Sequence, residues 1–407
     1  MSEAPLRRNR DFLLLQSGQL LSTFGSGMST VAYPLLTLAV THSASRAGYV
    51  GAALFAPLVV VGLPAGVAAD RVDRRRLMIA SDAAGAAAVG SLAFAIATDA
   101  ISFWLILVVA FVDSSAAVVF RAGQSGAFRA VVPRSQLAAA ASAAQARQAT
   151  VRLAAPPAGG ALFGIARFVP FLADACSYAF STASLLAMRT RFQEERAPRA
   201  ERPRLREGLA YFGRMPFLRA TIGMIAVSNF TFSALQLTVI VLAKRNGLSG
   251  TAVGGFVALT GASTLLGSFA SPLLRRLLPL RTILLSEFWS ALAYGAFLVE
   301  PNVYVLAAAL AVQAFFFPNS DSALTAYAYV LIPDRLLGRA MAASNTLRAA
   351  AAPLGPLAAG LLLTATSART TVAVAMSATL VTAAVGTASN AIRQAPARLE
   401  DVAPAPG

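Results

Sequence analysis

The chain has 407 residues, of which 57% are hydrophobic and 13% are charged, and this balance is too apolar for an ordinary soluble protein of that length. The formal net charge is +16. The basic residues fall in short clusters between apolar runs and leave no soluble basic domain, so nucleic acid is not an expected partner. The composition therefore indicates a polytopic membrane protein in a lipid bilayer.

Apolar runs of roughly 20 residues are long enough to cross a bilayer as α-helices. The first run is too long for the hydrophobic part of a signal peptide and lacks a convincing cleavage site, so we expect it to be retained. The runs predict an all-α membrane protein with twelve transmembrane helices, over residues 12–40, 47–69, 77–97, 102–122, 137–165, 168–188, 217–242, 251–273, 281–299, 302–330, 336–366 and 369–391.

The basic residues predict the orientation of these helices. If the N-terminus is cytoplasmic, the inner loops and tails hold 26 of the 34 Lys and Arg residues. Cytoplasmic loops of membrane proteins carry such an excess of positive charge. We therefore expect a protein of the inner (plasma) membrane with both termini in the cytoplasm.

A short charged loop separates the second and third runs. Gly66 and Asp70 lie four residues apart and share one helical face, where the glycine permits close approach of another helix and the carboxylate can cap a helix N-terminus. Arg71, Arg74 and Arg75 would hold the loop in the anionic interface. We expect these five residues to form a cytoplasmic gate; the alternative is an arginine-rich turn that only fixes topology.

The sequence repeats with a shift of about 200 residues, as expected of transporters built from repeated bundles. A shift of 200 aligns Ala155-Pro156 with Gly355-Pro356, and a shift of 201 aligns Gly66 with Gly267. The repeat predicts two pseudo-symmetric six-helix bundles, residues 1–189 and 217–407. Between them we expect a cytoplasmic linker, residues 190–216, with a short interfacial helix at 206–214.

The loop spacing G-x-x-x-D-R-x-x-R-R resembles the signature loop between helices 2 and 3 of the major facilitator superfamily. The chain also resembles that superfamily's drug:proton antiporter branch, which contains macrolide-efflux and enterobactin-exporter proteins. It departs from the family pattern at Ser26, where an Asp is frequent, at Asp73, where a second Gly is usual, and at Gly85, where an Arg is frequent. Six fragments carry the resemblance, at residues 8–12, 19–22, 41–44, 70–75, 171–174 and 353–356.

This resemblance implies the major facilitator fold and an alternating-access transporter whose cytoplasmic gate is latched by the loop at Gly66. It also implies that the fourth span lines a central cavity, whereas the third and ninth are peripheral. Asp82 and Glu287 in the peripheral spans, and Asp174 near one end of the sixth, are then expected to pair with arginines of the inner loops.

Ionisable residues inside a membrane span are costly and mark candidate sites. Asp113 lies about eleven residues, or roughly 16 Å, into the fourth run. Burial favours the neutral form of a carboxyl group, so Asp113 could exchange a proton, or it could be permanently paired with an arginine. Asp321, near the cytoplasmic mouth, is the second proton-coupling candidate. Arg147 and Arg348 could neutralise a buried acid, attract an anionic substrate group or serve packing alone.

Uncharged polar side chains mark the predicted cavity. Gln19, Ser22 and Ser26 share one face of the first span. Their alternative role is hydrogen bonding between helices. A large, mostly apolar cavity suits amphipathic organic molecules better than sugars. The substrate-cavity candidates are Gln19, Ser22, Ser26, Asp113, Arg147, Asn229, Ser233, Gln236, Gln313, Phe317 and Arg348.

Prolines mark the expected hinges, because each removes a backbone donor from its helix. They are Pro156 and Pro157 in the fifth span, and Pro353 and Pro356 in the eleventh. Rocking between two states of a transporter would use such places.

These patterns together predict a secondary active transporter that exports a hydrophobic or amphipathic small molecule such as a drug, antibiotic or siderophore, in antiport with protons and as a monomer. The rivals are an uptake permease of the same fold and a transport-inactive sensor or assembly factor. No enzyme is expected, since the phosphate-binding motif G-x-x-x-x-G-K-[ST] and the metalloprotease motif H-E-x-x-H are both missing from the sequence. With one Cys and one His, neither a metal site nor a cofactor is expected.

Overall fold

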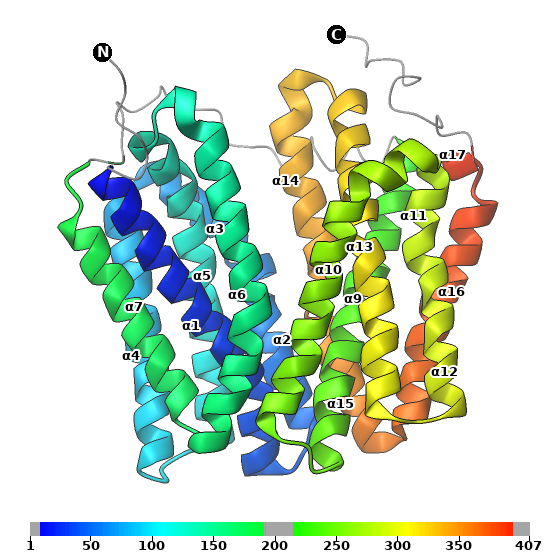
Figure 1. The fold of residues 1–407 in the computed structure, drawn as a ribbon, viewed down its shortest axis with the longest axis horizontal. Helices are drawn as coiled ribbons and strands as arrows, with labels where there is room; N and C mark the ends of the chain where they lie inside the picture. The colour runs from blue at the N-terminus through cyan, green and yellow to red at the C-terminus, as the bar shows by residue number, and fades with distance from the viewer. Residues whose placement is uncertain (1–8, 191, 193–214, 394–407) are drawn as a thin grey trace. The chain divides into compact units, whose positions relative to one another are not determined.

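The computed structural model describes residues 9–190, 192 and 215–393. Every regular element in these ranges is a helix (Figure 1). The described chain divides into two compact units, the first comprising residues up to 199 together with 243–258 and the second comprising 200–242 and 259–407. The predicted interfacial helix at 206–214 lies outside the described residues.

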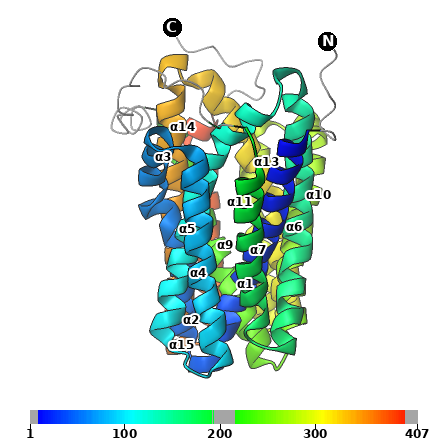
Figure 2. The same ribbon diagram turned by 90° about the vertical axis from the view of Figure 1, so that its left-hand side faces the viewer.

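The first unit is built from long helices joined by short connections. Figure 2 shows α1, α4, α5 and α7 running alongside one another. Side-chain caps begin several of these helices: Asn9 accepts a hydrogen bond from the Phe12 amide at 3.1 Å, and Asp73 accepts one from the Arg76 amide at 2.9 Å. Its helices are α1 (Arg10–Thr41), α2 (Ala44–Val60), α3 (Gly62–Arg71), α4 (Arg74–Ala97), α5 (Phe103–Val131), α6 (Leu137–Ile165) and α7 (Val169–Ala187).

The second unit repeats this pattern with more interruptions. The helices α9 and α10 contribute residues to both units. The elements are α9 (Pro216–Arg245), α10 (Gly250–Leu277), α11 (Leu280–Trp289), a 3-10 turn (Ser290–Ala293), α12 (Tyr294–Val299), α13 (Val303–Leu331), α14 (Asp334–Ala350), α15 (Leu354–Ala365), α16 (Ala368–Ala388) and α17 (Asn390–Arg393).

The helix bounds follow the predicted spans closely. The span at 137–165 coincides with α6, whereas three spans are divided in ways that the apolar pattern did not reveal. The second bends by 45° between α2 and α3, the ninth contains a 3-10 turn, and the eleventh is interrupted between α14 and α15. Among the described residues, eight helices are long and apolar enough to cross a membrane, or nine if the bent pair counts as one span. Twelve spans remain the prediction of the sequence.

Glycines bring two pairs of helices into close contact. A Cβ atom on Gly159 of α6 would lie 2.7 Å from the Met28 Cα atom of α1. A Cβ atom on Gly355 of α15 would collide with the Phe230 carbonyl and the Ser233 hydroxyl of α9. These contacts hold α1 against α6 and α9 against α15.

Candidate functional site

Asp113 lies in the first unit, on α5, and the hydrogen-bond partners of its carboxylate among the described residues are hydroxyl groups. The residue is 4% exposed. The Tyr33 hydroxyl of α1 donates to its Oδ2 atom at 3.0 Å, and the Tyr178 hydroxyl of α7 donates to its Oδ1 atom at 2.7 Å. No arginine forms an ion pair with Asp113 among the described residues. The pairing with an arginine that the sequence left open is therefore not found there.

Asp174 on α7 belongs to the same buried cluster. It is fully buried, and its Oδ1 atom lies 3.4 Å from the Ser26 hydroxyl and 3.3 Å from the Ser177 hydroxyl. The Ser26 hydroxyl also lies 3.1 Å from the Tyr178 hydroxyl, to which it donates. The Asp174 Oδ2 atom has no hydrogen-bond partner in the described structure. Two acids are thus joined through Ser26 and Tyr178.

The sequence pattern missed this role of Asp174. Asp174 is the sixth residue of α7 and was expected near a membrane surface, in contact with inner-loop arginines. Because α7 has 19 residues and α1 has 32, the start of α7 does not reach the end of α1: Phe171 packs on Tyr33, and Asp174 meets Ser26 at the middle of α1. The available signal was spacing, since Asp174 and Tyr178 share one helical face four residues apart.

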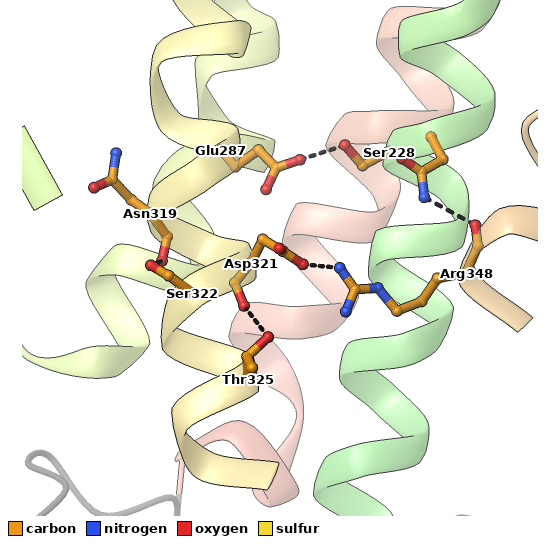
Figure 3. A network of polar contacts seen from close by, with 8 residues as sticks. Ser228, Glu287, Asn319, Asp321, Ser322, Thr325 and Arg348 are labelled. Atoms are coloured by element: carbon orange, nitrogen blue, oxygen red, sulfur yellow. Dashed lines mark hydrogen bonds and ion pairs between the residues drawn. The ribbon is translucent and has the colours of Figure 1, made fainter. Parts of the chain in front are cut away.

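In the second unit, Arg348 forms an ion pair with Asp321 (Figure 3). Their side chains are 13% and 37% exposed, and they come from α14 and α13. Figure 3 also shows that Glu287 of α11, which is 1% exposed, accepts a hydrogen bond from the Ser228 hydroxyl of α9. Arg348 therefore neutralises Asp321, one of the two proton-coupling candidates.

Two polar residues of α9 bind the interruption between α14 and α15. The Asn229 amide donates to the Arg348 carbonyl at 2.8 Å, and the Ser233 hydroxyl lies 3.0 Å from the Ala352 carbonyl. Helix ends leave carbonyl groups without intrahelical partners, and these side chains satisfy them. Asn229 and Ser233 thus make the interhelical hydrogen bonds that the sequence left as an alternative to lining a cavity.

The remaining cavity candidates are dispersed. Gln19 and Ser22 are buried, at 2% and 6% exposure. Gln313 is buried and accepts a hydrogen bond from the Tyr294 hydroxyl. Arg147 donates to the Gln16 side chain, while Gln236 and Phe317 are half-buried.

The charged loop is open within the first unit. Nothing lies within 4 Å of the position that a Cβ atom of Gly66 would take, and Arg71 is exposed. The Asp70 side chain is 78% exposed and lies 3.7 Å from Arg74 on the next turn. Asp73 caps α4 with extended backbone geometry, so the glycine usual in the family is not required for this turn.

Arg75 fastens the loop to α7. Its Nε atom donates to the Leu185 carbonyl at 3.0 Å, and its Nη2 atom donates to the Leu186 carbonyl at 2.9 Å. These carbonyls belong to the last turn of α7, where a cation also complements the helix dipole. The loop position of Arg75 is therefore set by a helix end.

Hydrogen bonds to Asp11 hold the residues that follow α7. Asp11, just before the first predicted span, accepts hydrogen bonds from the Thr190 hydroxyl, from the Thr190 amide at 2.7 Å and from the Arg189 amide at 3.1 Å. Burial alone would raise the pKa of Asp11, but these hydrogen bonds and the charge of Arg10 hold that pKa below its usual value.

The prolines behave differently in the two units. The helix α6 is continuous through Pro156 and Pro157. The eleventh span is interrupted at residues 351–353, directly before α15 begins, and Pro356 lies in the first turn of α15. A break in the backbone is thus present at only one of the two expected hinges in the described chain.

Solved structures with the same arrangement of helices are membrane transporters. A bacterial homologue of the human lysosomal transporter Spinster, inward-facing and unoccupied, has a TM-score of 0.75 at 16% identity, covering 96% of this chain and 98% of that one. The nucleoside transporter NupG reaches 0.72 at 13% identity, covering 95% and 99%. A bacterial homologue of the iron transporter ferroportin reaches 0.72 at 17% identity, covering 95% and 99%. The fold is that of the major facilitator transporters.

Sequence comparison identifies the family within that class. The chain belongs to the transmembrane secretion effector family, whose sequence model matches residues 1–404. It is a multi-pass membrane transporter and not an enzyme. The multidrug efflux pump Tap of Mycobacterium tuberculosis is 36% identical over 106 residues, about a quarter (25%) of each chain. An uncharacterized transporter of the superfamily from Bacillus subtilis, YfiS, is 26% identical over 275 residues, 65% of this chain and 64% of its own length.

Proposed function

We propose that the protein exports a hydrophobic or amphipathic small molecule across the plasma membrane by alternating access, in exchange for protons. The similarity to the efflux pump Tap supports export, and the basic inner loops support cytoplasmic termini. The single observation that carries the proton coupling is the environment of Asp113.

A carboxylate that exchanges protons must be able to exist in both forms. Asp113 is buried and receives hydrogen bonds from two tyrosines but has no ion-pair partner in the described residues. The hydrogen bonds stabilise its charged form, while burial favours its neutral form. Because no fixed cation holds it ionised, proton binding at Asp113 can respond to the side of the membrane that it faces.

The conformational parts of this proposal are the charged loop and the interrupted eleventh span. Gly66, Asp70, Arg71, Arg74 and Arg75 form the cytoplasmic gate, with Arg75 anchored on α7 and the exposed Asp70 next to Arg74. The interruption at residues 351–353, which includes Pro353, and Pro356 in the following turn are the hinge of the second unit, and Pro156 and Pro157 of α6 are the hinge of the first. The cavity residues named from the sequence contact the substrate, except Asn229, Ser233 and Arg348, whose side chains bind neighbouring helices.

The test uses the purified full chain in proteoliposomes loaded with fluorescent amphipathic probes that are cationic, neutral or anionic. With an imposed pH gradient, the wild type should move at least one probe against its concentration gradient. Asp113→Asn fixes the neutral form, so this variant should equilibrate the probe without accumulating it.

The outcomes separate this proposal from its rivals. Movement of the probe together with the proton would make the protein an uptake permease. Binding without movement would make it a transport-inactive sensor. Uphill transport by Asp113→Asn at the wild-type rate would place the coupling elsewhere, and Asp321 would then be the next acid to replace.

A further inference from the structure

The geometry points to Asp174 as a second proton-holding carboxyl group, joined to Asp113 through the hydroxyl groups of Ser26 and Tyr178. The inference rests on the proposed proton antiport and adds to it a second acid and a path between the two. All four residues lie in the first unit, on α1, α5 and α7. Asp174 was not among the candidates of the sequence.

The two carboxyl groups differ in how well their charged forms are stabilised. Asp113 receives a phenol hydrogen bond on each oxygen, at 3.0 and 2.7 Å. Asp174 has the Ser26 and Ser177 hydroxyls at 3.4 and 3.3 Å on one oxygen, and the buried Ser29 hydroxyl lies nearby, but the other oxygen receives no well-formed hydrogen bond in the described structure. A fully buried carboxylate with so little compensation is costly when ionised. The proton therefore resides on Asp174 while Asp113 is ionised.

Other charged groups near the cluster do not remove this difference. Other ionisable groups on the packed helices include Tyr33 on α1, the buried Asp82 on α4, Arg121 on α5 and the half-buried Arg147 on α6. At the ends of α1 and α4, Asp11, Arg74 and Arg75 have other partners. Arg147 is bonded to Gln16, and Arg121 interacts electrostatically with the Tyr178 hydroxyl. No ion pair joins these groups to Asp113 or Asp174 in the described ranges.

The hydroxyl groups between the two acids form a donor chain. With Asp174 protonated, its O–H group faces the Ser26 Oγ atom, Ser26 donates to the Tyr178 Oη atom at 3.1 Å, and Tyr178 donates to Asp113 at 2.7 Å. Transfer breaks the O–H bond on Asp174 and forms one on Asp113. Ser26 and Tyr178 each give one proton and receive one, so both stay neutral and the negative charge moves from Asp113 to Asp174.

One link of this chain is open. Hydrogen bonds between two oxygen atoms typically span about 2.5–3.0 Å, whereas Ser26 and Asp174 are 3.4 Å apart. Gly25 allows the close approach of α1 to this part of α7, because a Cβ atom there would lie 2.6 Å from the Asp174 Oδ1 atom. A small shift between α1 and α7 would close the link and couple proton transfer to helix movement.

The first test is infrared spectroscopy of the purified full chain during a pH titration, which needs no substrate. At neutral pH the wild type and Asp113→Asn should share one component of the carbonyl stretch of protonated, buried carboxyl groups that Asp174→Asn lacks, and Asp82→Asn and Glu287→Gln, which replace the other buried acids, should keep that component. Identical carbonyl-stretch bands in Asp174→Asn and in the wild type would show that Asp174 is ionised and would overturn the inference.

The second test is the rate of proton-driven exchange in proteoliposomes. Tyr178→Phe and Ser26→Ala keep both acids but interrupt the relay, and should slow exchange on the order of 100-fold, the usual contribution of a positioned proton-transfer group. Tyr33→Phe removes a donor from Asp113 outside the relay and should slow exchange less. Ser114→Ala is the matched control, since Ser114 follows Asp113 but its hydroxyl is bonded to the Leu54 carbonyl.

The results distinguish this inference from the proposed function. Wild-type exchange in Asp174→Asn, Tyr178→Phe and Ser26→Ala, with exchange lost in Asp113→Asn, would exclude the relay and leave proton antiport intact. Transport that ignores the pH gradient in the wild type would exclude antiport, and the infrared band alone would then decide whether Asp174 holds a proton. If Asp174→Asn does not fold, Ser26→Ala carries the test with both acids present.

Discussion

The two units place Asp113 and Asp321 in opposite electrostatic settings. In the first, Asp113 and Asp174 share serine and tyrosine hydroxyls and have no ion-pair partner in the described residues. In the second, Asp321 is paired with Arg348, whereas the buried Glu287 accepts a hydrogen bond from Ser228 (Figure 3). An acid next to a fixed cation stays ionised, whereas an acid among hydroxyls can change its charge. The first unit thus leaves Asp113 able to titrate, whereas the second holds Asp321 in an ion pair.

The largest effect is expected from neutralising acids in each unit. Asp113→Asn should abolish movement against a gradient, because it removes titration from the first unit. Glu287→Gln keeps the size of the side chain and a hydrogen-bond acceptor for Ser228, so it should retain such movement. Both variants are compared with wild type in proteoliposomes at matched protein content; loss in Glu287→Gln and retention in Asp113→Asn would reverse the assignment of the two units.

Glycine substitutions test whether equivalent helix contacts hold both units. Gly159→Ala and Gly355→Ala should each destabilise by about 1–3 kcal/mol, because the added methyl group overlaps the backbone of the facing helix. Gly164 and Gly295 have no neighbour near the Cβ position, and alanine there should stabilise by about 0.5–1 kcal/mol through helix propensity alone. Thermal unfolding in detergent measures the stability of all four variants. Equal changes in stability would show that the close contacts do not stabilise the units.

Breaking the ion pair should affect stability more than coupling. Arg348→Met leaves Asp321 without its partner and should cost about 1–2 kcal/mol, less than for a fully buried pair because the Asp321 side chain is 37% exposed. The double variant with Asp321→Asn should recover most of this loss. If Arg348→Met keeps its stability but loses proton coupling, Arg348 takes part in transport and does not mainly stabilise the fold.

The smallest stability effect is expected at the charged loop. Asp70 is 78% exposed and 3.7 Å from Arg74, so Asp70→Asn should change the free energy of unfolding by no more than about 0.5 kcal/mol. If the loop latches the gate, transport should fall while binding of the probe persists, since an amide is a poorer partner for a helix N-terminus. Unchanged transport at matched expression would reduce the loop to a topological anchor.

The sequence predicted helix positions well because a bilayer demands long apolar runs, and the bounds of α6 agree to the residue. It did not predict the breaks in the second and ninth spans, since apolar composition continues through them, whereas Pro353 and Pro356 did mark the interruption of the eleventh. Asp113 stood out as a single acid in an apolar run. The partners of Asp113 could not be predicted, because Tyr33 and Tyr178 reach it only through the way in which α1, α5 and α7 pack together. The same limit hid the role of Asp174 and the pairing of Arg348 with Asp321.

Proton release on ligand binding tests the separation between the two units most directly. Purified wild type, Asp113→Asn and Asp321→Asn would each be mixed, in weakly buffered detergent solution with a pH indicator, with a probe that the wild type transports. We expect proton release from the wild type and from Asp321→Asn, and none from Asp113→Asn. Release that persists in Asp113→Asn and disappears in Asp321→Asn would contradict the account, because the exchangeable proton would then belong to the second unit.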